Sequence, residues 1–284
     1  MVPLPEGYRS DEVLGFYGRD VPGVSEQVFP GGLRKALLID GKPVEVSIRF
    51  HGDSAACSVS GAQIADARPV VLRMLGLMGD GSTSGTTFEA LFADDPLIGA
   101  VLGRQRGLRI PLTPEPWEAL AWAIMGQQIS VKMAVVLRRE LILAAGSLHS
   151  GGLYAHPSAA VVAELDVETL RGLKFSRSKA EYMIAAAQAV ASGAVRLEAG
   201  SAEMLTSIRG IGPWTLQYLS LRGLGLPDCL PAGDVGLARG LERLTGKRPS
   251  EREIRDMMAR FAPHRSLATY HVWASLKDAV LDAD

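Results

Sequence analysis

The chain has 284 residues, 47% of them hydrophobic, which is enough for one large or two modest domains with a packed core. The 30 Lys plus Arg residues and 31 Asp plus Glu residues give a net charge of −1, so any contact with a polyanion must be local. Cys57 and Cys229 have no disulfide or metal-binding spacing, and no stretch suits a membrane span or signal peptide, so we expect a cytoplasmic protein with no metal, cofactor or membrane partner.

The first part of the chain has the pattern of a small antiparallel sheet. Polar and apolar residues alternate from Gly31 to Ser60, and Asp40-Gly41 separates two of the alternating runs, which is a hairpin signature. Ala56 to Val59 supplies a third run, and Ala65 to Leu77 has the spacing of a helix that packs on the sheet. We therefore expect an α+β N-terminal domain over residues 1–110.

A change of pattern marks the second part. The stretch from Gly76 to Thr87 is rich in Gly, Ser and Thr without periodicity, which predicts a flexible loop. After about residue 112 the strand signals disappear and apolar residues recur at helical spacing. Residues 111–284 are therefore expected to form a mostly α-helical domain.

The segment from Glu203 to Leu244 reads as helix, glycine turn, helix, loop and helix. The turn is Arg209-Gly210-Ile211-Gly212, whose two glycines permit positive φ and close backbone approach, and Pro213 suits the start of the next helix. Free backbone N–H groups at such a turn, with the positive end of the helix, bind one phosphate without any Lys or Arg. An ordinary connecting turn is the alternative interpretation.

Asp234 lies between a loop rich in Gly and Pro, Gly225 to Gly233, and the helix Val235 to Leu244. An aspartate at this place is a good N-cap. Capping is compatible with catalysis, because a carboxylate fixed at a helix start stays ionised and points to one place.

The hairpin, the loop and Asp234 together resemble the signature of the helix-hairpin-helix (HhH-GPD) DNA glycosylase superfamily. Other segments resemble its bacterial DNA-3-methyladenine glycosylase II type: VLGF at Val13 to Phe16, GLRIP at Gly107 to Pro111, Trp117 to Val131 with AIMGQQISV at its end, and PHRSLATYHVW at Pro263 to Trp273. The resemblance is strongest from about residue 107 to residue 275.

This resemblance implies a monomeric base excision repair enzyme that hydrolyses the N-glycosidic bond of alkylated bases in double-stranded DNA, of the 3-methyladenine and 7-methylguanine type. Asp234 would be the catalytic residue, because a carboxylate stabilises the positive sugar of the transition state or orients a water. Members with an added lyase activity carry a lysine where this chain has Trp214, and an indole forms no Schiff base. We therefore expect a monofunctional glycosylase.

The pocket for the base is expected to be aromatic, because an alkylated base is cationic and is attracted to aromatic faces. Trp214 and Tyr218 are i and i+4 on one helix and share a face. The resemblance adds Trp273 and Phe16 to this pocket. Core packing is the alternative role for each of these rings taken singly.

Contacts with DNA are assigned by the same resemblance. Gln128 matches the wedge position that fills the space of a flipped base, and Gln127 is beside it. The turn contributes five candidate phosphate-binding residues, which are Arg209, Gly210, Ile211, Gly212 and Thr215. A basic run is a further candidate, with a solvated helix end as its alternative; its members are Arg171, Lys174, Arg177 and Lys179.

Two other functions remain open from the sequence. A non-catalytic helix-hairpin-helix protein would bind DNA through the hairpin without needing Asp234 for chemistry. A glycosylase for neutral or oxidised lesions would need hydrogen-bond donors to the base edge, which the sequence shows less clearly than aromatic side chains.

Overall fold

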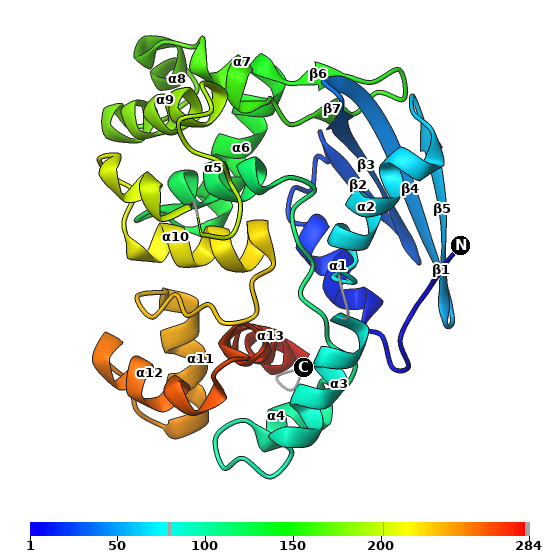
Figure 1. The fold of residues 1–284 in the computed structure, drawn as a ribbon, viewed down its shortest axis with the longest axis vertical. Coiled ribbons are helices and arrows are strands. Elements are labelled where there is room, and N and C mark those ends of the chain that lie inside the picture. Colours follow the sequence, from blue (N-terminus) through cyan, green and yellow to red (C-terminus); the bar gives the residue numbers. More distant parts are fainter. Residues whose placement is uncertain (79–80, 201, 282–284) are drawn as a thin grey trace.

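The computed structural model describes residues 1–78, 81–200 and 202–281. An antiparallel sheet lies on one side of the molecule, and helices fill the other side (Figure 1). This arrangement confirms the predicted α+β lobe followed by a mostly helical lobe with a helix-hairpin-helix motif.

The N-terminal sheet has five strands in the order β1-β5-β4-β3-β2, and all neighbours are antiparallel. The predicted hairpin is confirmed, since Ile39 pairs with Lys42 and the turn residues Asp40 and Gly41 have φ values of 49° and 73°. Such angles suit the tight turn that matches strand twist. The strands are β1 (Val2–Pro3), β2 (Glu26–Phe29), β3 (Gly32–Ile39), β4 (Lys42–His51) and β5 (Ser54–Ser60).

Two helices, α1 (Ser10–Tyr17) and α2 (Ile64–Met74), lie between the sheet and the helical lobe (Figure 1). Their apolar side chains, Val13 and Met74 among them, form one core with Leu37 and the other inward residues of the strands. The helix predicted over Ala65 to Leu77 is thus confirmed. Its packing fixes the position of α1, which reaches the cleft between the lobes.

The loop predicted over Gly76 to Thr87 is wrong for residues 81–87, which begin helix α3 (Gly81–Leu91); residues 79–80 lie outside the described residues. Tertiary packing explains the difference. Gly85 lies against the Arg109 guanidinium, so closely that a β-carbon there would overlap it, and Phe88 is fully buried. Close packing of this kind outweighs the low helix propensity of Gly, Ser and Thr.

Helix α3 and the short α4 (Gly99–Arg104) pack with the C-terminal helices through Phe88, Ile98 and Leu102. These residues lie within residues 1–110, the range predicted for the N-terminal lobe. The second lobe therefore receives a contribution from before residue 110, and the two parts of the chain interlock.

The helical lobe has one core around α5 to α10 and another around α11 to α13. A two-stranded ribbon in this lobe, β6 (Ser147–Leu148) with β7 (Tyr154–Ala155), was not predicted. The helices are α5 (Pro116–Gly126), α6 (Val131–Ala145), α7 (Ala159–Ala163), α8 (Val167–Gly172), α9 (Arg177–Ala191), η1 (Ala202–Ser207), α10 (Pro213–Leu219), η2 (Ser220–Leu224), α11 (Val235–Thr245), α12 (Glu251–Met258), η3 (Ala259–Phe261) and α13 (Arg265–Leu281).

The charges of the basic run are engaged within the chain. Glu168 binds two of its arginines at 2.8 and 2.7 Å, Lys174 binds Glu140 at 2.6 Å, and Lys179 donates to the carbonyl of Met125 at 2.7 Å. These pairs favour the solvated helix end over a phosphate-binding role.

Cys57 and Cys229 are both free. Among the described residues there is no group of three or more His, Cys, Asp and Glu side chains that suits a metal ion. Within the same part of the chain, the helices are too short or too polar to span a membrane.

A buried ionic network joins the sheet to the helical lobe. Glu26 accepts two hydrogen bonds from Arg138 of α6, at 2.7 and 2.9 Å, and one from the fully buried Lys35 at 3.1 Å. Lys35 also lies 3.4 Å from Glu118 of α5. Burial opposes ionisation of Glu26, but Arg138 and Lys35 outweigh it and lower its pKa to about 2.

We predict that Glu26→Gln lowers the free energy of unfolding at pH 7 by about 3 to 5 kcal/mol, because it removes the carboxylate that binds Arg138 and Lys35 most closely and leaves both with the more distant Glu118, at 3.7 and 3.4 Å. A carboxyl whose pKa falls on folding stabilises the protein above its unfolded pKa of about 4.3 and loses that effect below it. The difference in stability between the two proteins should therefore shrink as the pH falls from about 5 towards 2. Chemical denaturation at several pH values measures this.

Glu168→Gln is the control, because Glu168 binds two arginines but is exposed. It should change stability little. Equal effects of the two substitutions, or a pH-independent difference for Glu26→Gln, would contradict a role for this network in holding the lobes together.

Candidate active site

The hairpin turn between η1 and α10 uses its two glycines differently. Gly210 has a φ of 87°, and a β-carbon there would overlap the Tyr182 ring. Gly212 is the N-cap of α10 with an extended backbone, and a β-carbon there would meet nothing within 4 Å. The prediction that Pro213 begins the helix is confirmed. Positive φ is required only at the first glycine, and the second faces open space.

Gln127, at the end of α5, ties that helix to the hairpin. Its side-chain nitrogen donates to the carbonyl of Gly210 at 2.8 Å and to the hydroxyl of Thr215 at 3.1 Å. Gln128 follows it, is exposed and has a φ of 55°. A glutamine rarely adopts that conformation, and such strain is often found at functional positions.

The carboxylate of Asp234 receives three hydrogen bonds. Oδ1 accepts from the backbone N–H of Leu237 at 2.8 Å, which confirms the predicted N-cap of α11, and from the Trp273 indole at 2.9 Å. Oδ2 accepts from the Trp214 indole at 3.0 Å. Three donors on one carboxylate satisfy both of its oxygens and fix its orientation.

Space for this arrangement depends on Gly236. A β-carbon at that position would lie 3.0 Å from Asp234 Oδ1 and 3.5 Å from the Trp273 ring. Because position 236 has no side chain, the edge of the Trp273 indole can approach the Asp234 carboxylate.

The predicted aromatic residues of the helical lobe come together beside Asp234. The rings of Trp214 and Tyr218 are 5.5 Å apart, and those of Tyr218 and Trp273 are 6.3 Å apart. Tyr218 is buried, while both tryptophans are half-buried. Two of the three rings thus serve the carboxylate through their N–H groups and also present apolar faces.

Phe16 joins this cluster through Arg222, a residue that was not predicted from the sequence. The Arg222 guanidinium carbon lies 4.6 Å from the centroid of Phe16, 4.5 Å from that of Tyr270 and 5.6 Å from that of Trp273. Arg222 is 3% exposed and donates to the carbonyl of Pro111 at 2.8 Å. It fixes the segment between the lobes against the aromatic cluster.

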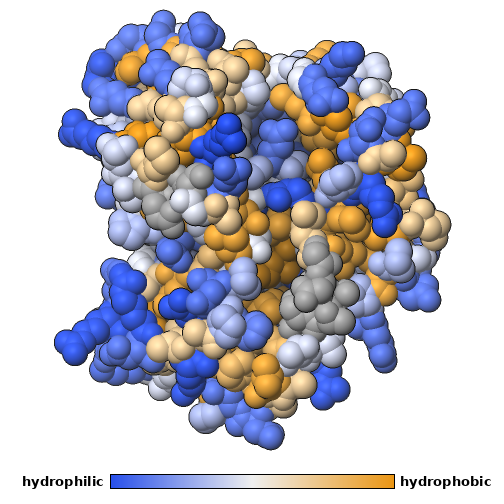
Figure 2. Space-filling view, in the orientation of Figure 1, coloured by the Kyte–Doolittle hydropathy of each residue, from blue (hydrophilic) through white to orange (hydrophobic). Residues whose placement is uncertain are grey.

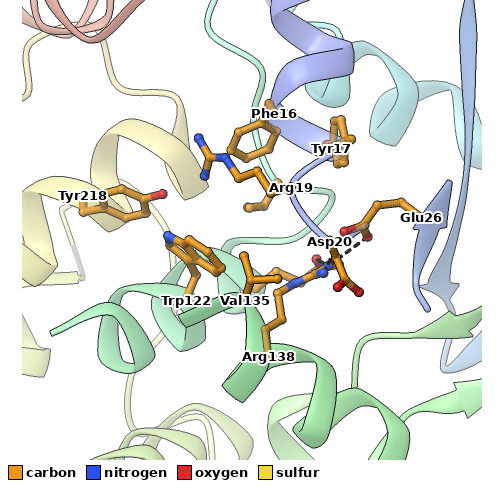
Figure 3. A pocket seen from close by; sticks show the side chains of 11 residues that line it. Phe16, Tyr17, Arg19, Asp20, Glu26, Trp122, Val135, Arg138 and Tyr218 are labelled. Carbon is orange, nitrogen blue, oxygen red and sulfur yellow. Dashed lines mark hydrogen bonds and ion pairs between the residues drawn. The ribbon is translucent and has the colours of Figure 1, made fainter. Parts of the chain in front are cut away.

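A cavity of about 50 Å³ lies between the lobes, and we call it the interlobe cavity (Figure 3). Phe16 and Arg19 come from α1 and the segment after it, Trp122 from α5, and Tyr218 from α10. Figure 2 shows a hollow with hydrophobic surface in the middle of this face and hydrophilic side chains around it. Tyr218 belongs both to this cavity and to the cluster beside Asp234.

Comparison with known proteins agrees with this geometry. Residues 121–263 match the family described as HhH-GPD superfamily base excision DNA repair protein, and this stretch includes the hairpin and Asp234. The chain belongs to the HhH-GPD superfamily of base excision DNA repair proteins.

Individual HhH-GPD relatives are similar over much of the chain. A Bacillus subtilis protein named "DNA-3-methyladenine glycosylase" is 32% identical over 203 residues, which are 67% of each chain. A Mycobacterium tuberculosis protein named "Probable bifunctional transcriptional activator/DNA repair enzyme AlkA" is 31% identical over 269 residues, or 92% of this chain. The present chain spans about half of that relative, 53% of its length.

Solved structures of HhH-GPD proteins share the fold. The "3-methyladenine dna-glycosylase from Archaeoglobus fulgidus" superposes with a TM-score of 0.84 over 96% of both chains at 22% identity. The similarity extends over both lobes, including the N-terminal sheet that lies outside the matched family segment.

Arg222, Arg19 and Trp122 are the site residues that sequence reasoning missed. Each lies in an ordinary helical or loop context, and the contacts that give it a place in the site come from elements distant in the sequence. Trp122 lies inside the segment that resembled the family. Its aromatic side chain there was the one sequence signal that could have pointed to the pocket.

We predict that Gly210→Ala lowers the free energy of unfolding by about 2 kcal/mol or more, because alanine must take a positive φ and displace the Tyr182 ring. Gly212→Ala is the matched control and should stay within about 0.5 kcal/mol of the unaltered protein, because its β-carbon meets open space. Thermal and denaturant unfolding measure both. If the two glycines tolerate alanine equally, the turn is not built as described.

Proposed function

We propose that this protein is a monofunctional DNA glycosylase that removes alkylated, cationic bases from double-stranded DNA and leaves an abasic site. The observation that carries the proposal is the Asp234 carboxylate, held by two indole N–H groups beside an aromatic cluster. The names of the Bacillus subtilis and Mycobacterium tuberculosis relatives support the same activity.

The reaction breaks the bond between C1′ of the sugar and the ring nitrogen of the base. The bonding electrons leave with the base, so positive charge develops on the sugar, and the Asp234 carboxylate stabilises that charge at close range. Water then adds its oxygen to C1′ and loses a proton, and the products are an abasic sugar and the free base. A fixed carboxylate contributes most because it needs no reorganisation as the charge appears.

A cationic base suits this site for two reasons. It departs as a neutral molecule, so the enzyme need not protonate it. It also gains from the aromatic faces of Trp214, Tyr218 and Trp273, because cations are attracted to aromatic rings. A neutral base lacks both advantages, which makes alkylated purines the favoured substrates.

The absence of lyase activity belongs to this proposal. Trp214 occupies the hairpin-helix position where the resemblance places the lysine of bifunctional members, and its indole N–H is already donated to Asp234. An amine is needed to form a Schiff base with the sugar. Base release should therefore leave the strand intact.

DNA binding is proposed to use the hairpin turn and the end of α5. The backbone from Arg209 to Gly212 precedes α10 and would bind a phosphate of the duplex, with Ile211 and Thr215 fixing its shape. Gln128, exposed and strained, would enter the space of the flipped base, with Gln127 holding that loop to the hairpin. One chain provides all these parts, so the protein acts as a monomer.

We predict that Asp234→Asn lowers the rate of base release from methylated duplex DNA by about a hundredfold or more, because the charge that stabilises the transition state is lost. Asparagine Oδ1 can still cap Leu237, so the helix keeps its start. The measurement is single-turnover release of 3-methyladenine and 7-methylguanine, with strand cleavage scored separately.

Asp166→Asn is the control, because Asp166 caps α8 by the same kind of bond to the N–H of Thr169, at 2.7 Å. It should leave base release unchanged. Near-normal release by folded Asp234→Asn would overturn the proposal, and strand cleavage by the unaltered protein would overturn its monofunctional part.

We predict that Gly212→Val weakens binding to plain duplex and to abasic-site duplex alike, by about fivefold to twentyfold, because the side chain stands where the phosphate would lie. Gly103→Val is the control, since Gly103 is exposed on α4 and a β-carbon there also meets nothing within 4 Å. Fluorescence titration measures both, after unfolding confirms that they are folded. Unchanged affinity of Gly212→Val would mean that the hairpin is a connector.

A further inference from the structure

Arg19 lines the interlobe cavity and belongs to the segment that follows α1. Its guanidinium carbon is 4.8 Å from the centroid of Phe16 and 5.7 Å from that of Trp122. The hydroxyl of Tyr218 points towards it from the opposite side (Figure 3). A planar cation thus occupies an aromatic site.

No carboxylate holds Arg19 in this position. The ion pairs between described residues do not include it, because its acidic neighbours bind other cations: Asp20 binds Arg139, and Glu26 binds Arg138 and Lys35. Desolvation by the cavity walls lowers the pKa of Arg19, while the Tyr218 hydroxyl opposes this effect. The guanidinium is therefore held by the faces of Phe16 and Trp122 and by the Tyr218 hydroxyl.

Arg19 differs from Arg222 in its freedom to leave. Arg222 is buried and donates to the carbonyl of Pro111, whereas Arg19 is exposed. An exposed arginine on aromatic faces gains only about 0.5 to 1 kcal/mol from them. A ligand that uses the same faces can displace it.

The cavity is too small for a base while Arg19 is present. Its volume of about 50 Å³ is well below the roughly 150 Å³ of a protein cavity that holds benzene, and a purine is larger than benzene. A base that enters between Phe16, Trp122 and Tyr218 must therefore take the place of the guanidinium.

We propose that Arg19 is a displaceable occupant of the base pocket, which a flipped base must drive out to solvent before it binds. The inference rests on the proposed function for the kind of ligand, a methylated purine cation. Such a ligand replaces the ring contacts that Arg19 loses, and its positive charge is repelled by the nearby guanidinium.

The free energy needed to displace Arg19 is then a threshold that a base must exceed in order to bind in the pocket. Displacement of Arg19 costs the same free energy for every base. A cationic base binds the rings strongly enough to remain flipped, whereas an undamaged neutral base returns to the duplex. Arg19 is thus a specificity-determining residue. Its loss should speed excision of weakly flipped neutral bases, such as hypoxanthine, more than that of alkylated bases.

The direct test is calorimetric titration of the full chain with 1,9-dimethyladeninium, a cationic purine, and with neutral 9-methyladenine, without DNA. Arg19→Ala should bind both about twofold to fivefold more tightly than the unaltered protein. Methylguanidinium, a substitute for the missing side chain, should compete with the purine in Arg19→Ala and weaken its binding towards the original affinity.

Arg49→Ala is the matched control, because the Arg49 guanidinium lies 5.0 Å from the Phe29 centroid on the sheet, outside the cavity. It should leave purine affinity unchanged. Unchanged or weaker binding by folded Arg19→Ala would overturn the inference, since weaker binding would make Arg19 a direct ligand of the base. This measurement needs no base excision. Its outcome is therefore independent of whether Asp234→Asn lowers base release.

Discussion

Two indole N–H groups converge on the Asp234 carboxylate, and the geometry of the candidate site depends on this convergence. Trp214 belongs to α10, Asp234 precedes α11 as its N-cap, and Trp273 belongs to α13, so one carboxylate connects three helices. A carboxylate in an aromatic cluster would be costly without such donors. The same bonds orient the two rings, so the stabilising charge and the aromatic faces are positioned together.

The pocket for a base needs a second constraint, which is the position of the N-terminal lobe. The matched family segment, residues 121–263, includes the hairpin and Asp234 but neither Phe16 nor Arg19, which α1 and its following segment bring to the cleft. The buried bonds of Glu26 to Arg138 hold that side of the sheet on α6. Asp234 and Trp214 thus lie within the family segment, whereas Trp273, Phe16 and Arg19 lie outside it.

Local patterns predicted the features that local chemistry determines. The alternation around Asp40-Gly41 gave the hairpin, and Asp234 at a helix start gave the N-cap. Features made by distant contacts were missed: α3 depends on Gly85 meeting Arg109, and the places of Arg19 and Arg222 depend on rings from several helices. Both glycines of the turn permit positive φ, but only Gly210 adopts it, which the sequence pattern does not determine.

The central claim is that Asp234 acts through its negative charge on a positive sugar. The most direct measurement compares the affinity of the protein for duplexes that carry a cationic pyrrolidine abasic nucleotide or its neutral tetrahydrofuran counterpart. The account predicts that the cationic duplex binds at least about tenfold more tightly and that Asp234→Asn removes this preference. Equal affinity for the two duplexes, or a preference that survives in Asp234→Asn, would contradict it.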